Sequence, residues 1–203
     1  MDKKVITIGR QFGSGGRAIG KMVAERLGIP FYDKEIIREI AKESGYSHAI
    51  INEYDEKPTN SFLYSLSLGA YNHGPIVAGM HDMPISDKIF ILQSNIIKDL
   101  AEQGPCVIIG RCAESVLRDK TEFLSVFVHA SDDYRAKRVA EYENISKSAA
   151  AELVRKTDKK RANYHNYYSD LRWGDATAYD LCVNGELGIE NAVELIIKAA
   201  EMK

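Results

Sequence analysis

The chain has 203 residues, of which 45% are hydrophobic and 28% are charged. This length and apolar content suit one domain with a continuous core, and a second independent domain is not expected. The formal net charge of −2 argues against a general nucleic-acid-binding surface, which needs an excess of Lys and Arg over one face. No stretch approaches the roughly 20 apolar residues of a membrane helix, and no signal-peptide pattern is visible, so we expect a cytoplasmic protein without membrane contact.

Four short runs rich in β-branched and aromatic residues are expected to form buried strands, because they are too short and too uniformly apolar for amphipathic helices. They are Val5 to Ile8, Cys106 to Ile109, Leu124 to His129 and Leu181 to Val183, and Pro30 to Tyr32 is a candidate fifth strand. Helical patterns fill the gaps between them, which is typical of a parallel sheet built from β-α-β units. The sequence therefore predicts an α/β fold that forms a single domain over residues 1–203.

The expected helices have recognisable ends. The first helical pattern follows the first strand directly and stops at Gly28, which can adopt the left-handed conformation of a helix end. Three serines stand ahead of later helical patterns and are predicted N-caps: Ser86, Ser131 and Ser146. A last amphipathic helix is expected from Asn191 onward. Residues 55–85 are interrupted by glycine and proline, and we interpret them as an inserted flap.

The most informative segment is the glycine-rich turn between the first strand and the first helix, Gly9-Arg10-Gln11-Phe12-Gly13-Ser14-Gly15-Gly16-Arg17. Glycines at such a turn let backbone N–H groups converge on an anion, and the positive end of the helix dipole adds to the attraction. The turn departs from the pattern G-x-x-x-x-G-K-[ST], because Gly16 stands where Lys would be and Arg17 follows it. We expect Arg17 to supply the missing positive charge. The alternative is a turn that binds no ligand.

Three further segments carry candidate residues, each with a structural alternative. Arg111 follows a predicted strand at the edge where parallel sheets bind ligands, and it suits either a substrate anion or a surface salt bridge. Asp33 suits either a substrate site or a helix N-cap. The basic segment 155–161 suits either a solvated helix face or a lid that closes over phosphates. The three cysteines and five histidines have no metal-ligand spacing, and we interpret each histidine as a packed or exposed residue.

Together these blocks resemble the cytidylate kinase-like family, relatives of P-loop nucleoside monophosphate kinases, over almost the whole chain. The matching segments are 9–17, 30–35, 109–111 and 158–161. The resemblance implies a three-layer α/β/α P-loop-type fold with a parallel five-stranded sheet in the order 2-3-1-4-5. It also implies a helical insert, placed at 55–85, and a basic lid over about 131–175.

The resemblance also implies roles for individual residues. The donor phosphates of ATP, with Mg²⁺, would lie on Gly13, Ser14, Gly15, Gly16 and Arg17. The acceptor would be bound by Asp33, Arg38, Arg111, Arg135 and Arg138. Catalysis by positioning and charge neutralisation would fall to Arg17, Arg111, Arg161 and Asp158. No residue is assigned to a metal.

The resemblance leaves the acceptor open, because Cys112 stands where true cytidylate kinases have an aspartate of the acceptor site. The leading hypothesis is an ATP-dependent phosphotransferase acting on a nucleotide or on another small hydroxyl- or phosphate-bearing molecule. One alternative is a kinase-derived module that senses a nucleotide or phosphorylated metabolite without turnover. Another is an interaction protein with an inert glycine-rich turn. Tyrosines in residues 55–85 also suit a homodimer surface.

Overall fold

The computed structural model describes residues 4–33, 47, 49, 51, 56, 83–119 and 122–203. Its centre is a parallel sheet with the strand order β2-β3-β1-β4-β5. The strands are β1 (Val5–Arg10), β2 (Phe31–Tyr32), β3 (Val107–Ile109), β4 (Phe123–His129) and β5 (Leu181–Asn184). The predicted strands and their order are therefore confirmed.

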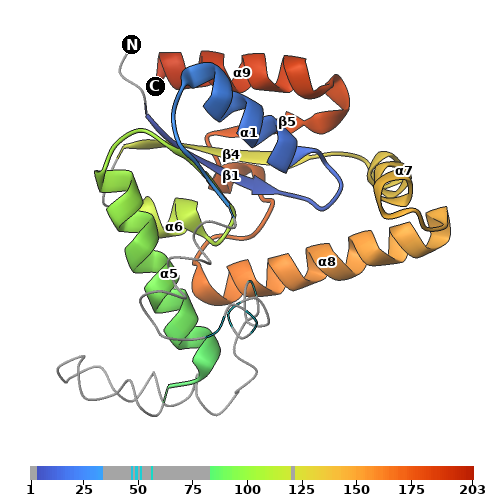
Figure 1. Cartoon of the computed structure of the whole chain (residues 1–203), viewed down its shortest axis with the longest axis horizontal. Coiled ribbons are helices and arrows are strands. Elements are labelled where there is room, and N and C mark those ends of the chain that lie inside the picture. Colours follow the sequence, from blue (N-terminus) through green and yellow to red (C-terminus); the bar gives the residue numbers. More distant parts are fainter. Residues whose placement is uncertain are drawn as a thin grey trace.

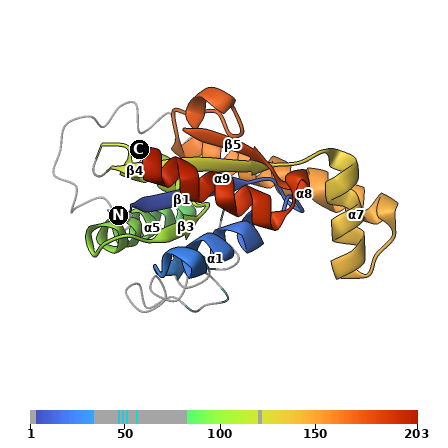
Figure 2. The same ribbon diagram turned by 90° about the horizontal axis from the view of Figure 1, so that it is seen from above.

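Helices cover both faces of the sheet and make the three layers visible in Figures 1 and 2. One face carries α1 (Gly16–Leu27) and α9 (Ile189–Met202), and the other carries α5 (Ile85–Glu102), α6 (Ala113–Leu117) and part of α8 (Lys147–Tyr168). Two 3-10 helices, η1 (Ala176–Ala178) and η2 (Gly185–Leu187), flank β5. As predicted, α1 ends at Gly28, which has a positive φ of 60°.

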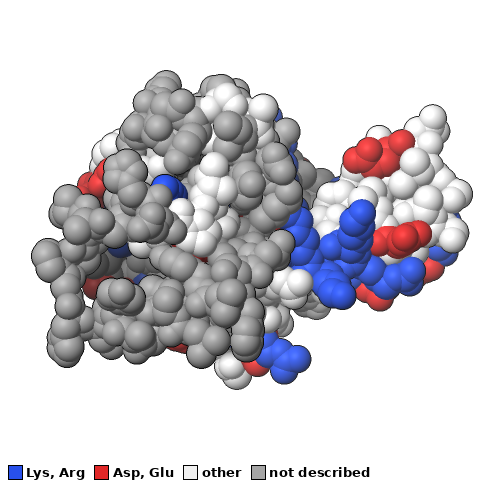
Figure 3. Space-filling view, turned by 90° about the horizontal axis from the view of Figure 1, so that it is seen from below, with Lys and Arg blue, Asp and Glu red and all other residues white. Residues whose placement is uncertain are grey.

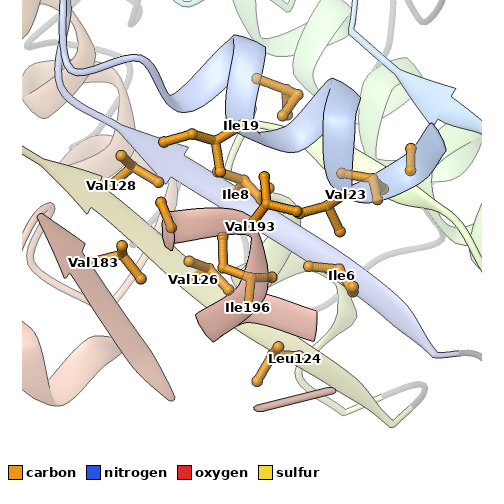
Figure 4. Packing of buried hydrophobic residues seen from close by; sticks show 14 residues of the cluster. Ile6, Ile8, Ile19, Val23, Leu124, Val126, Val128, Val183, Val193 and Ile196 are labelled. Carbon is orange, nitrogen blue, oxygen red and sulfur yellow. The ribbon is translucent and has the colours of Figure 1, made fainter. Parts of the chain in front are cut away.

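The core lies on both sides of the sheet because neighbouring strand residues point to opposite faces. Ile6 and Ile8 of β1 pack toward α1 and α9, whereas Val5 packs toward α5 and α6. Figure 4 shows Val193 and Ile196 of α9 over the first of these faces. This arrangement fixes β1 between β3 and β4, so the turn after β1 lies at the middle of the sheet edge.

Helices α7 (Asp132–Glu143) and α8 form a pair that extends beyond the sheet (Figure 1). The predicted caps are confirmed, because the side chains of Ser131 and Ser146 accept hydrogen bonds from backbone N–H groups at 3.4 and 3.2 Å. Figure 3 shows Lys and Arg side chains gathered where this projecting part meets the body. The exposed cations of α8 are Lys147, Arg155, Lys156, Lys159 and Lys160.

Two predictions concern the segment between β2 and β3: the N-cap Ser86 and the flap at 55–85. The predicted cap at Ser86 is wrong, because α5 begins at Ile85 after Pro84 and Ser86 is buried inside its first turn. Proline suits this position because it fixes the backbone at the helix start and needs no hydrogen-bond partner for an N–H group. Most of the predicted flap at 55–85 lies outside the described residues.

Packing of α9 on the sheet yields a stability prediction. Ile196 has no exposed surface, while its neighbour Leu195 is 47% exposed on the same helix. We expect Ile196→Ala to lower the free energy of unfolding by about 2–5 kcal/mol, because it removes buried methyl groups and leaves a cavity. Leu195→Ala is the matched control and should change it by less than about 1 kcal/mol. Equal losses in urea denaturation would contradict this packing.

Candidate active site

The glycine-rich turn has the backbone shape that an anion site requires. Gly13 and Gly15 have φ values of 81° and 91°, a region that residues with side chains rarely adopt. Gly15 is the N-cap of α1 and has no side chain to cover the amide groups of the first turn. Ser14 is buried, and its hydroxyl donates to the carbonyl oxygen of Gln11 at 2.8 Å. The start of α1 therefore presents its positive end at the middle of the sheet edge.

Close packing holds this turn from two sides. A Cβ atom at Gly185 would collide with the carbonyl oxygen of Ser14, so only glycine fits beside the turn after β5. A Cβ atom at Gly13 would lie 2.9 Å from the carbonyl oxygen of Arg135 on α7. Gly13 thus allows both a positive φ and the close approach of α7, and Gly185 allows the close approach of the turn.

Asp158 and Arg135 fasten the turn to α7 and α8. One Asp158 oxygen accepts from the Phe12 N–H group at 2.7 Å, and the other pairs with Arg135. Arg135 is buried and also donates to the carbonyl oxygens of Phe12 and Ala130, both at 3.1 Å. Burial raises the pKa of Asp158 above its ordinary value, although the Phe12 N–H group and Arg135 oppose this. Both side chains therefore hold the turn in place through their contacts with protein groups.

Arg138 lies on the α7 side of the same turn. Its guanidinium carbon is 5.7 Å from the centre of the Tyr134 ring, and a Cβ atom at Gly15 would lie 3.9 Å from its Nη2 atom. The Nε atom of Arg138 is buried and has no hydrogen-bond partner among the described residues. A buried donor on a cation beside the turn is a group that an anion would satisfy.

Glu56 sits between two arginines at the end of β1. It pairs with Arg10 at 2.9 Å and with the Nε atom of Arg161 at 3.4 Å, and Arg161 also donates to the carbonyl oxygen of Arg10 at 3.3 Å. Burial alone would raise the pKa of Glu56, but Arg10, Arg161 and Arg111 outweigh it and hold the pKa well below its ordinary range. Sequence reasoning missed Glu56 and Arg10, because their 46-residue separation gives no local signal.

A second carboxylate joins two of the predicted site residues. Asp33 is buried and pairs with the Nε atom of Arg17 at 2.6 Å and with Arg111 at 3.5 Å. The side chain of Arg17 is 60% exposed, whereas that of Arg111 is buried. Arg111 and Cys112 both have positive φ values, which turn the chain sharply after β3. The predicted residue Arg38 lies outside the described residues.

Glu56 and three of these arginines line one small pocket at the carboxyl ends of β1 and β3. Its free volume is about 20 Å³, which is room for roughly one water molecule. The pocket brings together the arginines at positions 10, 111 and 161, the carboxylates Glu56 and Glu114, and a group of further side chains. That group consists of Cys112, Tyr164, His165, Trp173 and Tyr179.

Two other properties concern only the residues that the structure describes. No helix among them is long and apolar enough to span a membrane. Within the same ranges, no group of three His, Cys, Asp or Glu side chains is placed to hold a metal ion.

A glycine-rich turn between β1 and α1 in a 2-3-1-4-5 sheet defines an α/β protein of the P-loop type. The model of the cytidylate kinase-like family matches residues 5–186, and the chain belongs to this family. The predicted family resemblance is thereby confirmed.

Individual proteins are similar over nearly the full length. The cytidylate kinase of Pyrococcus horikoshii is 28% identical over 201 residues, which cover 98% of this chain and 88% of that protein. The crystal structure of an uncharacterized protein from Eubacterium ventriosum is 31% identical with a TM-score of 0.74, and the match covers 99% of this chain and 100% of that one. Shikimate kinase from Bacteroides thetaiotaomicron shares the fold, with 16% identity and a TM-score of 0.56 over 98% and 99% of the two chains.

The ion pairs of Glu56 predict a specific dependence of stability on pH. Glu56→Gln leaves Arg10 and Arg161 without their shared carboxylate, and we expect a loss of about 3–5 kcal/mol at pH 7. A carboxyl whose pKa is lowered in the folded state stabilises it above the unfolded pKa, and this contribution declines as the pH falls. The difference between wild type and Glu56→Gln should therefore shrink below pH 4.5, the ordinary pKa of the group.

Urea denaturation between pH 7 and pH 3 measures this difference. Glu152→Gln, at an exposed position of α8, is the matched control and should have little effect at any pH. A difference between wild type and Glu56→Gln that stays constant down to pH 3 would show that the carboxylate is not held by the arginines.

Proposed function

We propose that this chain is an ATP-dependent kinase that transfers the γ-phosphoryl group to a small anionic acceptor. The observation that carries this proposal is the juxtaposition of an anion-binding turn with Arg10, Arg111 and Arg161 at one edge of the sheet. Phosphoryl transfer needs little covalent chemistry from the protein, and it depends on positioning and on neutralising charge. Membership of the cytidylate kinase-like family supports the same reaction class.

The donor phosphates are assigned to the glycine-rich turn. The residues fit such a group, because the N-cap Gly15 has no side chain to cover the start of α1, and the buried Nε atom of Arg138 has no hydrogen-bond partner among the described residues. We therefore move Arg138 from the acceptor to the donor side. Mg²⁺ bound with ATP would neutralise charge on the donor phosphates. In this arrangement we assign Ser14 to holding the turn, because it is buried and its hydroxyl donates to the carbonyl oxygen of Gln11 and accepts from the Gly16 N–H group.

The acceptor is assigned to the pocket that Glu56 occupies. Its carboxylate is a single negative group held between guanidinium groups, so it stands in for a phosphate or carboxylate of the acceptor. Arg111 faces this position from β3, and Asp33 links it to Arg17 beside the donor turn. Because the pocket has room for only about one water molecule, the Glu56 carboxylate must give way when an acceptor binds.

Arg135 and Asp158 take a different role in this proposal. All the nitrogen groups of the Arg135 guanidinium contact acceptors of the protein, including Asp132 on the same helix. A guanidinium engaged in this way is not available to a substrate. We therefore assign Arg135 and Asp158 to positioning the glycine-rich turn, in place of the substrate and catalytic roles expected from the sequence.

A melting-temperature screen with parallel measurement of ADP tests this function. The purified chain is incubated with Mg²⁺ and ATP, alone and with each nucleoside monophosphate and a set of small phosphorylated and carboxylated metabolites. A kinase is stabilised by ATP and releases ADP only with its acceptor, since ligand stabilisation follows concentration over Kd. Stabilisation without ADP would identify the sensor alternative, and no stabilisation by any nucleotide would refute a donor site on this turn.

The role of Arg161 gives a variant with a matched control in the same assay. We expect Arg161→Ala to lower kcat by about 10³-fold with little change in the affinity for ATP, because it removes a cation that neutralises transferring charge. Lys159→Ala changes an exposed cation of the same helix and should leave kcat within about twofold. Parallel losses of ATP affinity and of turnover in Arg161→Ala would contradict the acceptor-side placement.

A further inference from the structure

A buried histidine and glutamate form the second end of the acceptor pocket. The Nε2 atom of His165 on α8 lies 2.6 Å from the Oε1 atom of Glu114 on α6. Both residues are deeply buried, with 4% and 3% of their surface exposed, and both line the pocket with Arg111 and Arg161. None of the roles in the kinase proposal above uses this pair.

The contact with Glu114 indicates which ring nitrogen of His165 carries the proton and which can accept one. A carboxylate oxygen accepts hydrogen bonds, so we assign the ring proton to Nε2, and Nδ1 then carries the lone pair. The Nδ1 atom is buried and has no hydrogen-bond partner among the described residues. A buried acceptor without a partner is costly, and a hydroxyl group of a bound molecule would satisfy it.

His165 lines the same pocket as the three arginines. Arg161 and His165 are four residues apart on α8, so they lie one turn apart on the same face. Glu114 follows Arg111 by three residues, on the short helix that begins after the sharp turn at Cys112. The pocket therefore has a cationic end around Glu56 and a basic histidine next to it.

We propose that His165 is the general base of this kinase, and that the acceptor is a small anion that also bears a hydroxyl group. This inference rests on the proposed function. The hydroxyl proton passes to Nδ1 of His165 while the acceptor oxygen bonds to the γ-phosphorus and the bond to the ADP oxygen breaks. A nucleoside monophosphate accepts on a phosphate that is already ionised near neutral pH, so it needs no such base. The dyad thus favours a hydroxyl as the phosphorylated group.

Other charged and titratable groups line the pocket together with His165. The cations are Arg10, Arg111 and Arg161, and the acids are Glu56, Cys112, Glu114, Tyr164 and Tyr179. The arginines hold Glu56 ionised, while burial and then the charge of Glu114 raise the pKa values of Cys112 and Tyr179.

The test uses the full chain with Mg²⁺, ATP and two sets of probes. One set is CMP, AMP, UMP and GMP, and the other is the hydroxyl-bearing anions shikimate, gluconate and glycerol 3-phosphate. His165→Gln is the informative variant, because its amide N–H can still donate to Glu114 while the Nδ1 lone pair is lost. His129→Gln, on β4 outside the pocket, is the matched control.

We expect the wild type to phosphorylate a hydroxyl-bearing anion. His165→Gln should lower the rate by about 10²–10⁴-fold, with the ATP-induced rise in melting temperature retained. Glu114 is a positioning residue, so Glu114→Gln, whose amide oxygen can still accept from Nε2 of His165, should retain more of the rate than Glu114→Ala.

Other outcomes would overturn the inference, and they separate it from the kinase proposal. Transfer to a nucleoside monophosphate at the same rate in wild type and His165→Gln would refute the base and leave the kinase standing. Transfer to a hydroxyl at an unchanged rate in His165→Gln would do the same. ATP binding without ADP release for every probe in both sets would reject both proposals.

Discussion

The structure depends on how it accommodates arginines that are wholly or largely buried at one edge of a parallel sheet. An arginine keeps its proton in proteins, so a guanidinium taken out of water must find carboxylates or carbonyl oxygens. Here β1, the turn after β3, α7 and α8 each contribute one, at positions 10, 111, 135 and 161. Asp33, Glu56 and Asp158 supply the opposite charges, and these pairs set the geometry of the glycine-rich turn and the pocket.

The pairs differ in whether their partners can be exchanged. Arg135 binds backbone carbonyls and Asp158, which are fixed parts of the folded chain and hold the turn. Arg161 and Arg10 share the carboxylate of Glu56, a side chain that an anionic molecule can replace without breaking a strand or helix. By this distinction, Arg135 stabilises the structure of the site, whereas Arg10 and Arg161 can bind an anion there. It also accounts for the small free volume of the pocket when Glu56 is in place.

Local signals predicted much of the fold and the shape of the glycine-rich turn. The predicted runs 5–8 and 124–129 lie within β1 and β4, and Gly13 and Gly15 adopt the positive φ values that only glycine adopts readily. The strand order came from the family resemblance, because no local pattern states which strands are neighbours. The positions of Ser131 and Ser146 were found because a cap is a contact between residues three positions apart.

The acceptor side was less accessible to sequence reasoning for a physical reason. Glu56 meets Arg161 across 105 residues, and His165 meets Glu114 across 51, so these pairs exist only after the helices have packed. A histidine without metal-ligand spacing was interpreted as a packed residue, and only its unpartnered Nδ1 atom distinguishes it in the structure. Arg135 and Asp158 were found by motif, yet their contacts show that they position the turn.

Calorimetric titration with inorganic phosphate measures whether Glu56 occupies the place of a substrate anion. We expect Glu56→Gln to bind phosphate at least about tenfold more tightly than the wild type, because the carboxylate no longer competes for Arg10 and Arg161. This gain should disappear when Arg161→Ala is added. Equal phosphate affinity in wild type and Glu56→Gln would show that Glu56 does not hold the place of a substrate anion.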